Sequence, residues 1–226
     1  MSVTEQREGI EAGRLDMFVD GAFAFTLTLL AIGGETIPDS GSRLVALLRG
    51  IPAAACCFAQ IAMMWHGHVR WRRLCPRSTT PGLLFSLVLV FLALVFVYPL
   101  HMVYASAFCG FSGGLLSPEF TMKSWLDIKA VYVCFGLAFA CMSGTLVLLF
   151  RHAARQPGLA GATRLQARVE AVGWSLPVAI GLVSVVLTLL LPDTTGGLLT
   201  ALPGMVYMLM FLTGPVVSGF RRRYAS

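Results

Sequence analysis

Long apolar runs separated by short polar segments dominate the chain. They fall at about residues 17–33, 44–66, 82–107, 128–150, 171–191 and 198–220. Each is near the roughly 20 residues that a helix needs to cross a bilayer. The runs are continuous and do not alternate with polar residues, which argues against a transmembrane β-barrel. The pattern predicts an all-α integral membrane protein, with residues 1–226 forming a single membrane domain of six transmembrane helices.

Composition agrees with this interpretation. The chain has 226 residues, of which 57% are hydrophobic and 12% are charged, whereas soluble domains carry about 25% charged residues. Six spans with short connections leave no room for a separate soluble domain. Pro177, Pro203 and Pro215 interrupt the last two runs and predict kinks in those helices. The six cysteines form no CxxC pair, so we expect them to be reduced packing residues.

The basic residues predict an orientation. With six spans, both termini and the two loops at about 67–81 and 151–170 share one side of the membrane. Thirteen of the 17 basic residues lie in these segments: Arg7, Arg14, Arg70, Arg72, Arg73, Arg77, Arg151, Arg155, Arg164, Arg168, Arg221, Arg222 and Arg223. The positive-inside rule therefore places both termini in the cytoplasm. The net charge of +6 is explained by topology, and we expect no nucleic-acid partner.

The first apolar run carries most of the candidate chemistry. Asp20 lies within it, and an acidic residue inside a membrane helix indicates function by default. A capping role at the headgroups, or a pair with Arg14, explains Asp20 equally well. Gly21, Phe25, Thr28 and Ile32 fall on one narrow stripe of the helix at 100° per residue. From the spacing alone, ordinary helix packing accounts for this stripe.

A short motif resembles a known family. Arg14-x-x-x-Phe18-x-Asp20, followed by Gly21 and Phe-Ala-x-x-x-Thr-Leu-Leu, is similar to the opening of the first helix in the transmembrane protein 175 family. These proteins are endolysosomal potassium channels and their prokaryotic homologues. Trp65 and His68 near the end of the second run resemble the family's Trp and His. The chain departs from the pattern at Val19, where the family has Ser, and at Gly67, where it has a more polar residue.

The resemblance implies a specific channel. Prokaryotic members are homotetramers whose four first helices line a pore, with bulky rings and a threonine layer acting on permeant ions. Carried onto this chain, the pore positions are Phe25, Thr28 and Ile32, with Gly21 on the same stripe. Phe25 replaces an aliphatic residue of the family. The resemblance thus favours a pore over packing, and it implies a potassium-preferring or weakly selective cation channel in a bacterial inner membrane.

The motif residues receive a structural role in this interpretation. Asp20 lies about 140° from Phe25 around the helix, so we expect it, with Arg14 and His68, to tie the first helix to the second. Phe18 and Trp65 complete the predicted network. Hydrophobic rings can gate by dewetting, and hydroxyl oxygens can replace part of an ion's hydration shell.

Other function classes have less support. A proton-conducting channel or proton-coupled transporter stays the alternative, in which Asp20 and the histidines would titrate. No nucleophile–base pair, metal cluster or nucleotide loop indicates an enzyme, and His66 and His68 fall on different helix faces. We expect no cofactor, no bound metal and no soluble substrate. The expected partners are further copies of the chain, membrane lipid and permeant potassium or other monovalent cations.

Overall fold

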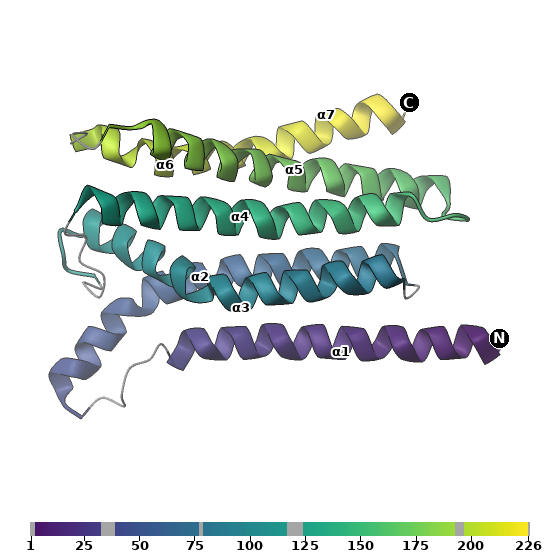
Figure 1. The fold of residues 1–226 in the computed structure, drawn as a ribbon, viewed down its shortest axis with the longest axis horizontal. Helices are drawn as coiled ribbons and strands as arrows, with labels where there is room; N and C mark the ends of the chain where they lie inside the picture. Colours follow the sequence, from purple (N-terminus) through teal and green to yellow (C-terminus); the bar gives the residue numbers. More distant parts are fainter. Residues whose placement is uncertain (1–2, 33–38, 77–78, 117–123, 193–196, 226) are drawn as a thin grey trace.

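The computed structural model describes residues 3–32, 39–76, 79–116, 124–192 and 197–225, and within this part it is all-helical (Figure 1). Five long helices come first: α1 (Val3–Ile32), α2 (Gly41–Leu74), α3 (Thr80–Phe111), α4 (Trp125–Ala154) and α5 (Gly161–Leu190). A broken segment follows, made of η1 (Gly197–Ala201), α6 (Leu202–Met205), η2 (Val206–Leu212) and α7 (Thr213–Ala225). The predicted all-α fold class is confirmed.

The helices are longer than the apolar runs that predict them. α2 continues to Leu74 through residues expected to be loop, and α4 continues to Ala154. The apolar run marks the thickness of the hydrocarbon, whereas helices continue into the interface, where arginine side chains reach water. Side-chain caps define several starts. Ser124 and Asp127 form a capping box at α4, which satisfies backbone N–H groups that a helix start leaves unpaired.

Five segments among the described residues are long and apolar enough to cross a membrane. Four are α2, α3, α4 and α5, and the fifth runs over Leu199–Arg223. The last is interrupted by 3₁₀ turns, whereas α5 passes Pro177 without a break. α1 is not among these five segments. The count of six spans therefore stays a prediction.

The chain brings its arginine-rich segments to one end of the bundle. Figure 1 shows both termini at the end where α2 meets α3 and where α4 meets α5. This is the grouping of segments that the distribution of arginines predicts. The N-terminal part of α2 leans out of the opposite end, and every residue from Gly41 to Arg49 is exposed.

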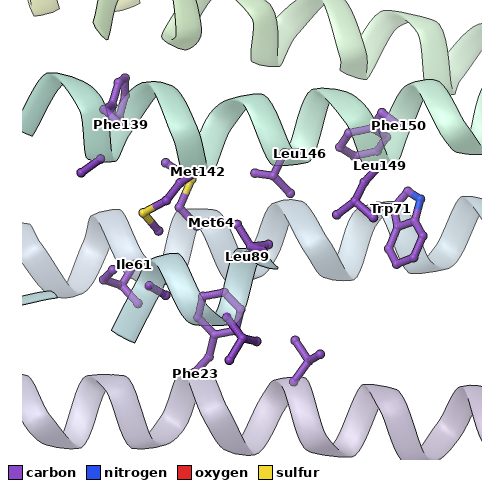
Figure 2. Close-up of a cluster of buried hydrophobic side chains, with 14 of the residues drawn as sticks. Phe23, Ile61, Met64, Trp71, Leu89, Phe139, Met142, Leu146, Leu149 and Phe150 are labelled. Carbon is purple, nitrogen blue, oxygen red and sulfur yellow. The ribbon is translucent and has the colours of Figure 1, made fainter. Parts of the chain in front are cut away.

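The core is centred on α4, with α5 on one side and α2 and α3 on the other (Figure 1). The largest fully buried side chains include Ile61 and Met64 of α2, Leu89 of α3, and Met142 and Leu146 of α4 (Figure 2). Lipid is as apolar as these side chains, so burial from water does not drive helix association within a bilayer. Close packing and dispersion must hold the bundle together.

Glycines allow α4 and α5 to approach most closely. A Cβ on Gly181 would lie 2.7 Å from the carbonyl oxygen of Gly136 and 3.1 Å from the backbone nitrogen of Ala140. A Cβ on Gly136 would lie 2.8 Å from the carbonyl oxygen of Gly181. Backbone atoms cannot move aside as a flexible side chain can. The contact therefore depends on the missing side chains, as in other small-residue interfaces between membrane helices.

We predict that Gly181→Ala destabilises the bundle by about 1–3 kcal/mol, the usual cost of overpacking. Gly144→Ala is the matched control, because its Cβ would meet only Val178 Cγ2, at an ordinary 3.9 Å. Thermal unfolding in detergent should show a lower midpoint for Gly181→Ala and an unchanged or higher one for Gly144→Ala. Equal midpoints for the two variants would contradict the close α4–α5 contact.

Candidate functional site

α1 has one packed face and one exposed face. The packed face carries Leu15, Val19, Phe23, Thr26 and Leu30, all buried. Their spacing of three or four residues is that of a single helix face turned toward a protein core. The predicted stripe lies elsewhere on the helix.

The predicted stripe is exposed in the single chain. Gly21 and Thr28 are exposed, and the Phe25 side chain is 57% accessible. Phe18 and Arg14 continue the exposed stripe toward the start of α1. The side chain of Ile32 lies outside the described residues. The exposed stripe, defined here as Arg14, Phe18, Gly21, Phe25 and Thr28, thus makes no contribution to the core of its own chain.

Two threonines on α1 make the same local hydrogen bond on different faces. Thr28 Oγ1 donates to the carbonyl oxygen of Ala24 at 2.9 Å, and Thr26 Oγ1 donates to that of Ala22 at 2.9 Å. In each case the hydroxyl proton points back along the helix, so the oxygen lone pairs stay available as acceptors. Thr26 is fully buried and Thr28 is exposed. Only Thr28 therefore offers its oxygen to the outside of the chain.

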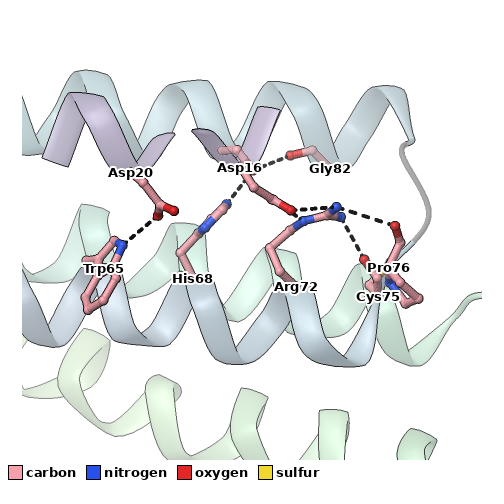
Figure 3. Close-up of polar contacts among 9 residues, drawn as sticks. Asp16, Asp20, Trp65, His68, Arg72, Cys75, Pro76 and Gly82 are labelled. Carbon is pink, nitrogen blue, oxygen red and sulfur yellow. Dashed lines mark hydrogen bonds and ion pairs between the residues drawn. The ribbon is translucent and has the colours of Figure 1, made fainter. Parts of the chain in front are cut away.

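Asp20 joins α1 to α2 through Trp65 (Figure 3). Trp65 Nε1 donates to Asp20 Oδ1 at 2.8 Å. The predicted partners, Arg14 and His68, do not contact this carboxylate through any hydrogen bond or ion pair in the described part of the chain. Asp20 does connect the two helices, as expected, but the indole N–H is the group that binds it.

His68 is directed to α3 and not to α1. Its ring is 1% exposed, and Nε2 lies 2.9 Å from Ser86 Oγ. Ser86 Oγ donates its own proton to the carbonyl oxygen of Gly82 at 2.8 Å. The serine oxygen can then only accept from the histidine, so Nε2 carries the hydrogen. His68 thus holds α2 against α3 as a fixed donor (Figure 3).

A second contact between α1 and α2 involves Asp16 and Arg72 (Figure 3). Arg72 Nε lies 2.6 Å from Asp16 Oδ1, and Nη2 lies 3.3 Å from Oδ2. The same guanidinium donates to the carbonyl oxygens of Cys75 and Pro76 at the end of α2. Such a two-pronged pair fixes orientation as well as adding energy.

Neither residue of that ion pair is among the predicted site residues, because Arg72 counts in the sequence as one of the arginines that set the topology. A signal was present in the spacing. Asp16 and Asp20 are four residues apart on α1, and Trp65, His68 and Arg72 follow the same helical period on α2. Two antiparallel helices with these spacings can pair Asp20 with Trp65 and Asp16 with Arg72 together.

The described residues contain no group of three or more His, Cys, Asp or Glu side chains that could hold a metal ion. Arg14 has no hydrogen-bond or ion-pair partner within the described part. The site therefore consists of the exposed stripe, whose polar group available to the outside is one threonine hydroxyl. The contacts of Asp20 with Trp65 and of Asp16 with Arg72 hold α1 in place.

Comparisons with known proteins identify related potassium channels. The family model described as "Endosomal/lysosomal potassium channel TMEM175" matches residues 14–99, which contain the α1 stripe and both α1–α2 contacts. A protein of Marivirga tractuosa named "Potassium channel" is 26% identical over 228 aligned residues, covering 95% of this chain and 91% of the relative.

A solved structure has the same fold. It is the crystal structure of a variant of the potassium channel MtTMEM175 in complex with a nanobody–MBP fusion protein. The TM-score is 0.77 at 25% sequence identity, with 94% of this chain and 93% of the other covered. The motif, the family model over residues 14–99 and this shared fold together support a prokaryotic member of the TMEM175 family of potassium channels.

Proposed function

We propose that the chain is a potassium-preferring cation channel, formed by four copies with their α1 helices around a central pore. The exposed stripe on α1 carries this proposal. A membrane helix that packs only one face leaves the other to lipid or to further protein. Gly21 offers lipid no side chain to contact, and the Thr28 hydroxyl is a polar group facing outward. The relatives, in addition, are named as potassium channels. A water-filled pore at the centre of the assembly is an environment in which both a small residue and a hydroxyl group have a role.

The stripe has the chemistry that such a pore requires. Phe25 and, one turn beyond Thr28, Ile32 would form apolar rings that exclude water when the pore narrows. Thr28 would supply a ring of oxygens between them, each with its proton already donated to Ala24. Four oxygen acceptors can replace part of the hydration shell of a potassium ion. Selectivity in this arrangement needs no backbone filter loop.

The contacts behind the stripe support its direction. The Asp20–Trp65 and Asp16–Arg72 pairs attach α1 to α2, and they leave Phe25 and Thr28 pointing away from the bundle. The arginine-rich end would face the cytoplasm by the positive-inside rule. The protein would then lie in the bacterial inner membrane with both termini inside the cell.

Reconstitution in liposomes tests the function. With purified protein in vesicles, we expect the reversal potential to follow an imposed potassium gradient, and native mass spectrometry to give four chains per particle. A potential that follows the pH gradient and ignores potassium would instead support the proton-conducting alternative. A monomer or dimer that conducts potassium would contradict the shared pore.

We predict that Phe25→Ala raises single-channel conductance by about twofold or more and weakens the preference for potassium over sodium, because the apolar constriction widens. Phe91→Ala is the matched control: Phe91 is similarly exposed, at 63% against 57% for Phe25, but lies on α3. Planar-bilayer recordings of both variants provide the measurement. Unchanged permeation in Phe25→Ala would place the pore elsewhere.

We predict that Thr28→Val brings the potassium-to-sodium permeability ratio close to unity while the channel still assembles. Valine keeps the shape of the side chain but has no oxygen atom that could coordinate a cation. Thr26→Val removes an equivalent hydroxyl that also bonds to the carbonyl four residues earlier, on the buried face. Bi-ionic reversal potentials should change for Thr28→Val alone. Equal changes in both variants would indicate an effect on helix structure and not on ion coordination.

A further inference from the structure

A hollow of about 190 Å³ lies between α4, α5 and α7, on the arginine-rich end of the bundle. α4 contributes Arg151 and Ala154, and Phe220 comes from α7. The α5 wall consists of Arg168, Ala171, Val172 and Ser175. In Figure 1 α5 and α7 lie on the side of α4 away from α1, and no residue of α1 lines the hollow.

Two arginines line this hollow and have no ion-pair partner in the described part of the chain. Both of them, Arg151 and Arg168, are exposed. The acidic residue nearest in sequence, Glu170, is bound by Arg70. The C-terminal end of α4 favours a positive charge at Arg151, but Arg168 lies well inside α5 and has no such compensation.

A third arginine, Arg164, lies on the same helix as Arg168 but does not line the hollow. Arg164 precedes Arg168 by one helical turn on α5, and its Nε is buried with no hydrogen-bond partner in the described part of the chain. The guanidinium groups of Arg151 and Arg168, which line the hollow, match the planar, multi-oxygen face of a phosphate. The charge at the hollow therefore indicates an anion, and specifically an oxyanion.

The remainder of the hollow is apolar, which narrows the ligand class. Ala171 is buried, and Ala154, Val172 and Phe220 are partly buried. Pockets that enclose a soluble small molecule usually measure about 300–1,000 Å³, so a volume of about 190 Å³ suits only part of a ligand. An amphiphile whose charged group binds here while its chains remain in the bilayer meets both conditions.

We infer that this hollow binds the phosphate headgroup of an anionic phospholipid. Arg151 and Arg168 hold the phosphate oxygens, and the apolar wall contacts the glycerol and the first part of an acyl chain. Basic pockets between membrane helices are a known type of lipid site. A bound lipid would neutralise the repulsion between the arginines and connect α4, α5 and α7.

The test is a titration of delipidated, detergent-purified protein with phosphatidylglycerol, followed by native mass spectrometry and by the thermal unfolding midpoint. The wild type should show a saturable lipid adduct and a raised midpoint. Arg151→Gln with Arg168→Gln should weaken lipid affinity by about tenfold or more, from a cost of about 1 kcal/mol per basic residue.

The matched control removes the same charge from the same end of the bundle. Arg155→Gln with Arg222→Gln changes two exposed arginines that do not line the hollow. General attraction to an anionic surface would fall equally in both double variants, whereas a built site predicts loss only in the first. Equal losses would overturn the proposal.

Two further arms identify the ligand and separate binding from misfolding. Ser175→Trp closes the exposed mouth of the hollow without changing charge, and it should abolish the lipid adduct while leaving the midpoint of lipid-free protein near that of the wild type. Phosphatidylcholine and inorganic phosphate should each raise the midpoint far less than phosphatidylglycerol does. A full response to inorganic phosphate would indicate a small-anion site, and a full response to phosphatidylcholine would indicate a site for any lipid; either overturns the inference.

Discussion

The rotation of α1 about its own axis is the constraint on which the rest of the site depends. Both faces of α1 carry large apolar side chains, Phe23 on the packed face and Phe25 on the exposed one, so apolar character alone does not decide which face turns to the bundle. The polar contacts to α2 make the choice. A turn of one residue, about 100°, would remove Asp20 from Trp65 and leave the carboxylate without this hydrogen bond. The face presented by Thr28 is thus fixed by residues that do not lie on it.

The sequence predicts this face but not the contacts that fix it. Helical periodicity places Gly21, Phe25 and Thr28 together because the period of a helix is a local property, and the apolar runs predict the helices for the same reason. Partners across helices depend on registration, which one helix cannot specify. Asp20 is therefore predicted to act between the first two helices, yet its partner is Trp65 and not Arg14 or His68. Arg72 is hidden among loop arginines because α2 extends beyond its apolar run.

The arginines at one end of the bundle serve different purposes that a charge count cannot separate. Arg72 pairs with Asp16 and also satisfies carbonyl oxygens at the end of α2, so it completes a helix while joining another. Arg70 binds Glu170 and connects α2 to α5. Arg151 and Arg168 have no such partner in the described part and face a hollow. The positive-inside rule predicts that all four share one side of the membrane, but the contacts of each arginine determine what it does.

Thr26 and Thr28 have the same local chemistry but different surroundings. Each hydroxyl donates to the carbonyl oxygen four residues earlier, so the helix by itself leaves both oxygens equally available as acceptors. They differ by two residues, or about 200° of rotation, which places one against its own bundle and the other outside it. Since α2 sets that rotation through Trp65 and Arg72, the packing of α1 and its proposed role in ion coordination are one property of the sequence. In the proposed channel, a change on the hidden face would therefore alter permeation without touching the pore.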